Sequence, residues 1–260
     1  ADIVVNISVK DDNTIPNSKV KLRDDGEGDL KIWAVPNCLQ VENRYLVSVD
    51  IGGKSTTSDY TVMTVIDRFG MIPTVKGKPK VVARYRGHVR HDKLAWMAAA
   101  LAHYYDDALL VIESNTADRE KNNNTEGDHF LTILQEIADY YDNLYQRTSS
   151  SENVEDNVLA KYGFQTNKLT KQQVIDNLEE FIDDNLYEEP DKEMYHELRI
   201  YERHDDGSLG NIVGNGNHDD VVMSTGIGLF VSLTDMEKPS WKKAERRSRG
   251  GDGVHTAAKI

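Results

Sequence analysis

The chain carries an aspartate inside an apolar run that is typical of a buried β-strand. Residues 46–51 read Leu-Val-Ser-Val-Asp-Ile, and after a turn at Gly52 and Gly53 a second apolar run rich in β-branched residues follows at 59–67. A carboxylate in such a strand is costly to bury as a charge unless it has a partner, and at functional sites that partner is most commonly a bound cation. Asp50 therefore predicts that other carboxylates come to meet it in the folded chain.

The order of elements after residue 44 predicts an α/β fold. Strands at 45–51, 59–67 and 79–86 are joined by short turns, which favour antiparallel pairing of consecutive strands. A helix at 92–105 has its apolar residues on one stripe, and a continuous apolar strand at 108–113 is typical of a parallel sheet. This order is what an RNase H-like fold requires, namely a mixed central β-sheet with helices on both faces.

The rest of the chain predicts further α/β elements between two less regular ends. Helices are expected at 127–142, from Thr170 onwards with a Thr170–Gln173 capping box, and from 219 to 233; strands are expected at 144–148, 198–202 and 210–213. We expect residues 1–43 to form an N-terminal β appendage, with strands at 2–9 and 30–35 around a polar loop. A core domain would then cover 44–235, and 236–260 would be a basic, disordered tail.

Charge is distributed unevenly along the chain, whose net charge is -13. Residues 170–206 hold thirteen acids and four bases, whereas 238–260 hold seven bases and two acids, and 75–93 hold seven bases and one acid. A strongly acidic total disfavours a nucleic-acid partner, but local basic strips can still bind phosphates. Solvated faces of opposite sign explain the same pattern equally well.

Two absences in the sequence bear on the compartment. No apolar segment is long enough to span a membrane. The single cysteine, Cys38, cannot form an internal disulfide, which fits a reducing cytoplasm. The start at Ala1, without a methionine or a leader pattern, suggests a piece of a longer protein and not a secreted one.

Acids stand at the ends of three apolar elements. Asp50 lies in the first core strand, Glu113 closes the strand at 108–113, and Asp219 and Asp220 open the last helix. If the first and fourth core strands are neighbours, Asp50 and Glu113 lie side by side and the last helix packs against that edge. Mg²⁺ and Mn²⁺ prefer such oxygen ligands, and two ions could activate a water and stabilise the leaving oxygen of a phosphodiester.

Each acid also has an ordinary structural explanation. Asp50 could accept hydrogen bonds from the turn that follows it, and Glu113 could mark where a strand leaves the core. Asp219 or Asp220 could be a helix N-cap, and we expect one of them to be the cap and the other a ligand. The three positions together are much more specific than any one alone.

Weaker candidates surround this set. Asp59 could hold a second ion or be a turn aspartate, and His218 could assist a phosphate or a water or simply flank the helix cap. The basic tail is expected to contact DNA. Other candidate DNA-binding side chains are Lys168, Lys171, Arg84 and Arg86.

Several motifs together resemble one known family. They are Val-Ser-Val-Asp-Ile-Gly-Gly at 47–53 with Ser-Asp-Tyr at 58–60, Leu-Val-Ile-Glu-Ser-Asn at 110–115, Tyr-Gly-Phe-Gln-Thr-Asn at 162–167 with Thr170 and Lys171, and above all His-Asp-Asp-Val-Val-Met-Ser at 218–224. Over residues 44–233 the chain is similar to the nuclease domain of the terminase large subunit, the DNA-packaging motor protein of tailed phages and prophages.

The resemblance implies an RNase H-like nuclease domain at 44–235 that cleaves double-stranded, concatemeric phage DNA with two Mg²⁺ or Mn²⁺ ions. Asp50, Glu113 and Asp220 match the catalytic acids of the family, with Asp219 as an adjacent ligand and Asp59 as a tentative further one. The implied partners are double-stranded DNA, the terminase ATPase domain (absent from this chain), the small terminase subunit and the portal protein, with no membrane partner. The implied location is the cytoplasm of the bacterial host.

Other functions remain open on the same residues. Asp-Ile-Gly-Gly-Lys-Ser at 50–55 resembles the first phosphate loop of actin-like ATPases and sugar kinases, centred on Asp50, Gly52, Gly53, Lys54 and Ser55. Such proteins need a second Asp-x-Gly phosphate loop after a strand, which neither 206–207 nor 252–253 provides. A non-catalytic packaging scaffold with a degenerate site is a third possibility. A RuvC-like junction resolvase would differ from a terminase nuclease mainly in its substrate.

Overall fold

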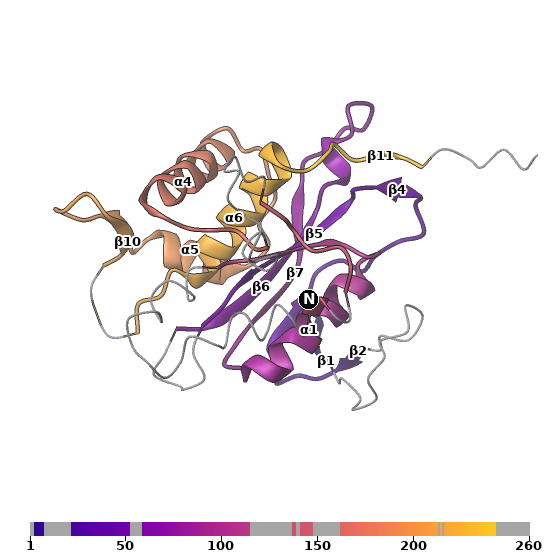
Figure 1. Cartoon of the computed structure of the whole chain (residues 1–260), viewed down its shortest axis with the longest axis horizontal. Helices are drawn as coiled ribbons and strands as arrows, with labels where there is room; N and C mark the ends of the chain where they lie inside the picture. The colour runs from indigo at the N-terminus through magenta and orange to yellow at the C-terminus, as the bar shows by residue number, and fades with distance from the viewer. Residues whose placement is uncertain are drawn as a thin grey trace, which may run out of the picture.

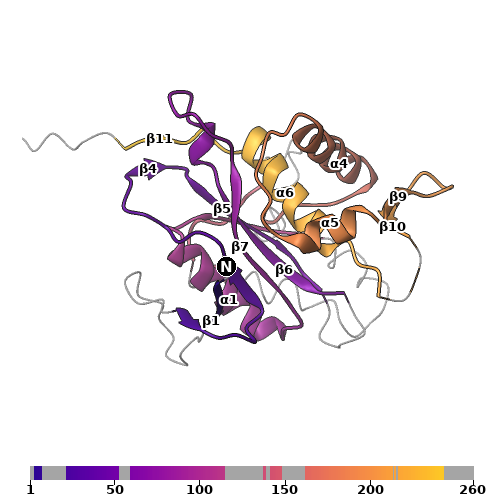
Figure 2. The same ribbon diagram turned by 180° about the vertical axis from the view of Figure 1, so that it is seen from behind.

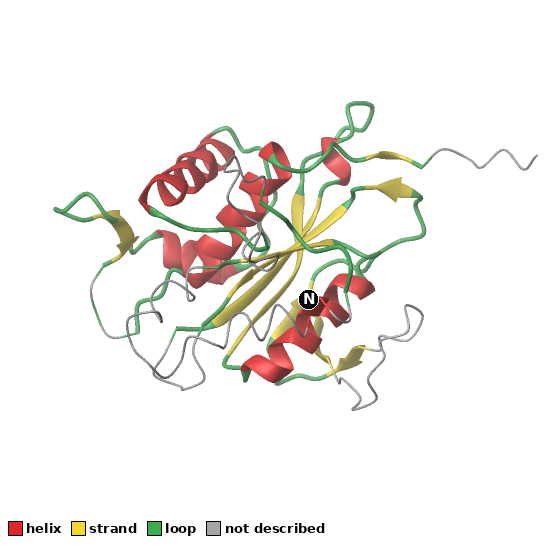
Figure 3. Cartoon of the chain, viewed as in Figure 1, coloured by secondary structure: helices red, strands yellow, loops and turns green. Residues whose placement is uncertain are grey.

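A mixed β-sheet with helices on both faces forms the centre of the protein (Figures 1 and 3). The computed structural model describes residues 3–7, 22–52, 59–114, 137–138, 141–147, 162–212, 214 and 216–242. The seven strands of the sheet are β1 (Ile3–Ile7), β2 (Leu22–Asp24), β3 (Leu30–Ile32), β5 (Tyr45–Asp50), β6 (Thr61–Asp67), β7 (Lys80–Gly87) and β8 (Leu109–Ile112). Their order is β2-β1-β3-β7-β6-β5-β8, and only the β5–β8 pair is parallel.

The order predicted for the RNase H-like core is confirmed. Strands β5, β6 and β7 pair consecutively and antiparallel, and α1 (His91–Tyr104) leads into β8, which returns parallel to β5. Beyond β8 the sheet edge continues irregularly: Leu144 and Phe164 form single parallel bridges with Leu110 and Glu113. The strand expected at 144–148 is therefore present only as isolated bridges in the described residues.

The alternation of side chains along β5 decides which face receives its acid. Tyr45, Val47 and Val49 belong to the core beneath α1, whereas Leu46 belongs to the core on the opposite face. With a period of two, Asp50 falls on the same face as Leu46. Figure 2 shows that α4, α5 and α6 cover that face and α1 covers the other.

Helix α6 (Asp220–Thr234) lies directly on β5 and β6, and α4 (Lys168–Asp183) packs over it. The helix is apolar on nearly all sides because it is enclosed in this way. Gly228 permits the close approach, since a Cβ atom there would lie 2.7 Å from Ile66 Cδ1 and 3.2 Å from Ser48 Cβ.

Several local predictions were wrong. The capping box of α4 is formed by Asn167 and Thr170, not by Thr170 and Gln173. The strand expected at 198–202 begins later, as β9 (Tyr201–Arg203), because a short helix, α5 (Lys192–Leu198), comes before it. Asp191 begins α5 by accepting a hydrogen bond from Glu193 N–H. The hairpin partner of β9 was predicted correctly and is β10 (Leu209–Asn211).

Both ends of the described chain are attached to the core. Strand β2 lies within the segment expected to be a polar loop, and β3 is hydrogen-bonded to β7, so the N-terminal strands extend the central sheet. Strand β11 (Ser240–Trp241) pairs with β4 (Val41–Glu42), so the start of the predicted disordered tail is ordered. A single 3₁₀ turn, η1, spans Phe69–Met71.

Some predictions lie outside the described residues, and the domain boundaries at 43 and 235 stay predictions. Of the helix expected at 127–142, the structure describes helical residues at 137–138, where Ile137 is buried. Residues 53–58, with Lys54 and Ser55, and most of the basic tail also lie outside the described part. No helix among the described residues is long and apolar enough to cross a membrane.

Candidate metal and active site

Asp50 and Glu113 lie side by side at the ends of the only parallel strand pair in the described sheet. Val49 is in register with Ile112, and Glu113 N–H donates to Val49 O at 2.9 Å. Burial raises the pKa of Asp50 well above its ordinary value, and the neighbouring charge of Glu113, a hydrogen bond to it and the charge of Asp220 act in the same direction. The two carboxyl groups therefore interact strongly in the absence of a cation.

The start of α6 brings the second pair of acids to the same place. Asp220 is buried, and its Oδ2 accepts a hydrogen bond from Tyr60 N–H at 2.9 Å. Asp219 forms an ion pair with Lys171 at 3.3 Å. Burial, opposed by the Tyr60 hydrogen bond and assisted by the charges of Asp59 and Asp219, raises the pKa of Asp220 to about 7.

One cleft of about 590 Å³ holds every acid singled out in the sequence. Its lining includes Asp50, Asp59, Glu113, Asp219 and Asp220. The structure thus brings together residues that are up to 170 positions apart in the chain. The cleft also contains residues that the sequence did not single out as functional: Thr166, Asn167, Gln172, Asp206, Ser208 and Met223.

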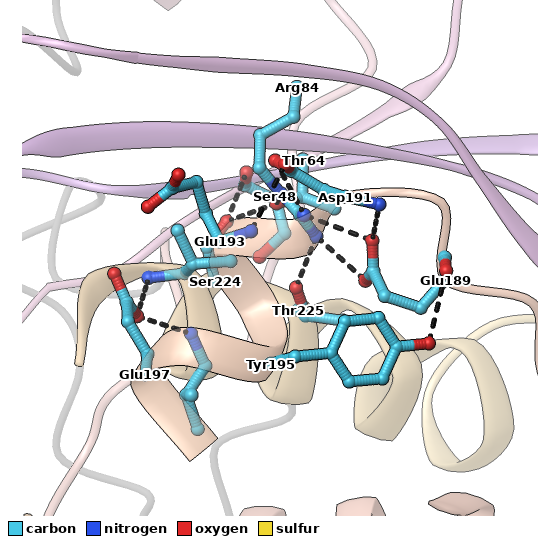
Figure 4. Close-up of polar contacts among 12 residues, drawn as sticks. Ser48, Thr64, Arg84, Glu189, Asp191, Glu193, Tyr195, Glu197, Ser224 and Thr225 are labelled. Carbon is cyan, nitrogen blue, oxygen red and sulfur yellow. Dashed lines mark hydrogen bonds and ion pairs between the residues drawn. The ribbon is translucent and has the colours of Figure 1, made fainter. Parts of the chain in front are cut away.

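The expectation that Asp219 or Asp220 caps α6 with its side chain was wrong. Asp219 occupies the N-cap position but makes no side-chain cap hydrogen bond. The cap comes from α5: Glu197 Oε2 accepts from Val221 N–H at 2.8 Å and from Val222 N–H at 3.1 Å (Figure 4). Both aspartates are therefore left to face the cleft. No sequence pattern predicted the role of Glu197, since it lies 23 residues before Asp220 in an acidic segment.

A buried arginine holds the other end of α6. The Arg68 side chain donates to backbone oxygens of Ser232, Met236 and Glu237, at 2.8, 3.4 and 3.0 Å, and to Asn43 O at 2.6 Å. A hydrogen-bond acceptor at the N-terminus satisfies free amides of the first turn, and a cation at the C-terminus complements the helix dipole. Helix α6 is therefore fixed at both ends by side chains from other elements.

The two arginines predicted to bind DNA have other partners. Arg84 is 1% exposed and contacts Glu189, Asp191, Thr64 and Thr225 (Figure 4), so the prediction that it binds DNA was wrong. Its guanidinium lies between the sheet and α6, where it donates to Thr64 Oγ1 on β6 and Thr225 Oγ1 on α6.

Arg86 is partly exposed, and its guanidinium lies 3.7 Å from the centre of the Tyr60 ring. Lys168 and Lys171 do line the cleft.

The raised pKa of Asp220 makes the stability of the metal-free protein depend on pH. A carboxyl group with a pKa of about 7 when folded and about 4 when unfolded binds its proton more tightly in the folded state. Stability should therefore fall as the pH rises from about 4 to about 7, by on the order of 2–4 kcal/mol for this group. The raised pKa values of Asp50 and of Glu197, the latter to about 8, have the same sign.

Urea unfolding in EDTA at pH 5 to 8 measures this dependence. Asp220→Asn should reduce this dependence by the share that Asp220 contributes, whereas Asp183→Asn, at an exposed position at the end of α4, should leave it unchanged. A wild-type protein that becomes more stable between pH 5 and pH 8 would contradict the prediction.

The donor set fits a divalent cation. Six carboxylates line the cleft, and the described cationic side chains in its lining are Lys168 and Lys171. Hard cations such as Mg²⁺ and Mn²⁺ bind through several such oxygens, and a bound cation would offset both the burial and the mutual repulsion that raise the pKa values of Asp50 and Asp220.

The sheet order and the position of the acids at the edge of β5 and β8 define an RNase H-like fold. Among solved structures, the chain is similar to the large terminase nuclease from the thermophilic phage G20c, at 20% identity and a TM-score of 0.50, over 78% of this chain and 89% of that one. A structure of the same nuclease with bound magnesium has 18% identity and a TM-score of 0.51, over 79% and 88% of the two chains. No family model and no curated protein matches the sequence.

The predicted resemblance to terminase nucleases is thus confirmed at the level of fold.

Proposed function

We propose that this chain is a divalent-metal-dependent endonuclease that cleaves double-stranded DNA during viral genome packaging. The observation that carries the proposal is the convergence of Asp50, Glu113 and Asp220 in one cleft. Two of these carboxyl groups have raised pKa values, which is a common property of functional sites. The likeness in fold to a nuclease with bound magnesium supports the same proposal.

In this proposal Asp50, Glu113 and Asp220, with Asp219 and Asp59 beside them, hold two Mg²⁺ or Mn²⁺ ions. When bound, the ions would supply an activated water and stabilise charge on the leaving oxygen of the phosphodiester. The chain itself fixes the carboxylates: Glu113 through its backbone bond to Val49, and Asp220 through the Tyr60 N–H.

Lys168 and Lys171, on the first turn of α4, are the basic side chains we propose for contact with the DNA backbone at the cleft. Lys171 already lies 3.3 Å from Asp219, so it also limits the repulsion among the acids. Arg86 and the basic tail remain further candidates. We further propose the partners and location of a terminase: an ATPase domain, a small subunit and a portal protein in the host cytoplasm.

Cleavage of supercoiled plasmid by the purified protein tests the proposal. We expect nicked and linear products with Mn²⁺ or Mg²⁺, none with EDTA, and none with Glu113→Gln. Glu180→Gln, an exposed position on α4, is the matched control and should cleave like the wild type. Equal cleavage by Glu113→Gln and the wild type would refute the assignment, because a contaminating nuclease would explain it.

The ATPase alternative is not favoured. With a first phosphate loop at 50–55, such a protein needs a second Asp-x-Gly loop after a core strand, whereas the Asp206–Gly207 turn lies at the tip of the β9–β10 hairpin. A scaffold with a degenerate site would leave the raised pKa values of the cleft acids without a role. Absence of both metal binding and cleavage would favour it.

A further inference from the structure

His218 directs a ring nitrogen at two carboxylates of the cleft. Its Nδ1 lies 3.4 Å from Asp59 Oδ1 and 3.7 Å from Asp220 Oδ2. That nitrogen is buried and has no hydrogen-bond partner within the part of the chain that the structure describes. A buried polar atom without a partner is unfavourable, so a group that binds it would stabilise the protein.

The orientation of the His218 ring is fixed by an aromatic stack. The ring packs edge-on against Tyr60, with centroids 4.9 Å apart and an interplanar angle of 78°. Tyr60 is held in turn between the His88 ring, 4.3 Å away, and the Arg86 guanidinium. His218 therefore presents Nδ1 to the two carboxylates from a supported position.

The spacing of these atoms suits a metal ion. The donor atoms of Asp59, His218 and Asp220 all lie within 4.8 Å of one another. Neighbouring ligands of a six-coordinate ion with bonds of about 2.1 Å are about 3 Å apart, and opposite ligands about 4.2 Å apart. Asp59 can adjust to these distances at little cost, because its side chain is 76% exposed.

We propose that Asp59, His218 and Asp220 form a cation position with one nitrogen ligand, and that this nitrogen makes the cleft favour Mn²⁺ and later first-row divalent ions over Mg²⁺. Imidazole suits transition metals, whereas Mg²⁺ prefers oxygen ligands throughout. The position shares Asp220 with the acidic site, so the role of the cation in catalysis rests on the proposed function. The experiment that tests the position does not depend on that function.

A protonated His218 that simply pairs with Asp59 and Asp220 is the competing explanation. It predicts no nitrogen ligand to a bound ion. The two explanations differ in whether an imidazole nitrogen coordinates a bound Mn²⁺ ion.

Pulsed electron paramagnetic resonance of Mn²⁺ bound to the tag-free protein tests the proposal. We expect coupling to ¹⁴N of an imidazole in the wild type and in His196→Asn, an exposed control histidine on α5. In His218→Asn the coupling should vanish and the Kd for Mn²⁺ should rise about 10-fold or more, while the Kd for Mg²⁺ changes much less. Unfolding curves in EDTA must first establish that His218→Asn is folded.

Two results would overturn the proposal: Mn²⁺ bound to the wild type without nitrogen coupling, or coupling that persists in His218→Asn. The readout needs no DNA, so it separates this inference from the proposed function. A protein that cleaves plasmid but lacks the nitrogen signal overturns only the inference. A protein with the signal but without cleavage overturns only the proposed nuclease activity.

Discussion

Asp50→Asn is expected to lower the rate of DNA cleavage by about a thousandfold or more, the scale on which removing one group that stabilises a transition state acts. The substitution removes a carboxylate that lines the cleft beside Glu113 and Asp220, and that we propose as a metal ligand. The same change should raise the stability of the metal-free protein by roughly 1–3 kcal/mol, because it removes a charge whose burial already raises the pKa of Asp50.

Opposite signs for activity and stability are the distinctive part of this prediction. Single-turnover cleavage of plasmid in Mn²⁺ and urea unfolding at pH 8 in EDTA measure the two effects. Asp183→Asn is the control for the loss of one surface carboxylate. A variant that loses both activity and stability would indicate that Asp50 has a structural role instead.

Arg84→Met is expected to lower the free energy of unfolding by about 3–5 kcal/mol, as removal of one member of a buried ion pair does. Glu189 and Asp191 have side chains only 3% and 4% exposed, and Arg84 is 3.0 and 3.1 Å from them. Loss of the guanidinium would leave two carboxylates buried with only Lys31 still paired to Asp191. Lysine would not replace arginine here, because the paired contacts to Glu189 need a planar fork.

Urea unfolding measures this loss, with Arg199→Ala as the control at an exposed arginine. If Arg84→Met does not fold, the triple variant with Glu189→Gln and Asp191→Asn should restore folding, because it leaves no unpaired charge. An Arg84→Met protein as stable as the wild type would show that the ion pairs of Arg84 with Glu189 and Asp191 contribute little to the free energy of unfolding.

The central strands and the meeting of Asp50 with Glu113 could be predicted because both follow from local patterns. A period of two fixes the face of each strand, and a parallel strand after a helix fixes the neighbour. The roles of Arg84 and Glu197 could not be predicted in this way. Arg84 lies in a basic strip that looks exposed, and its carboxylate partners come 105 and 107 residues later.

Short, polar elements also could not be predicted from the sequence. Helix α5 has seven residues in a strongly acidic segment, too few to show a helical period of apolar residues. It forms because Met194 is fully buried and Glu197 is used at the start of α6. Its stability thus comes from contacts with α6 that only the folded chain provides.

The fixing of α6 at both ends also bears on how the site moves. Helix ends usually fray, and such terminal opening costs little free energy. Here the amides of Val221 and Val222 donate to Glu197. At the opposite end of α6, Arg68 donates to the backbone oxygen of Ser232. Fraying that would release Asp220 therefore requires separation of α5 from α6. The carboxylate keeps its place as long as that contact persists, so under the proposed function a cation would meet acids that are already in position.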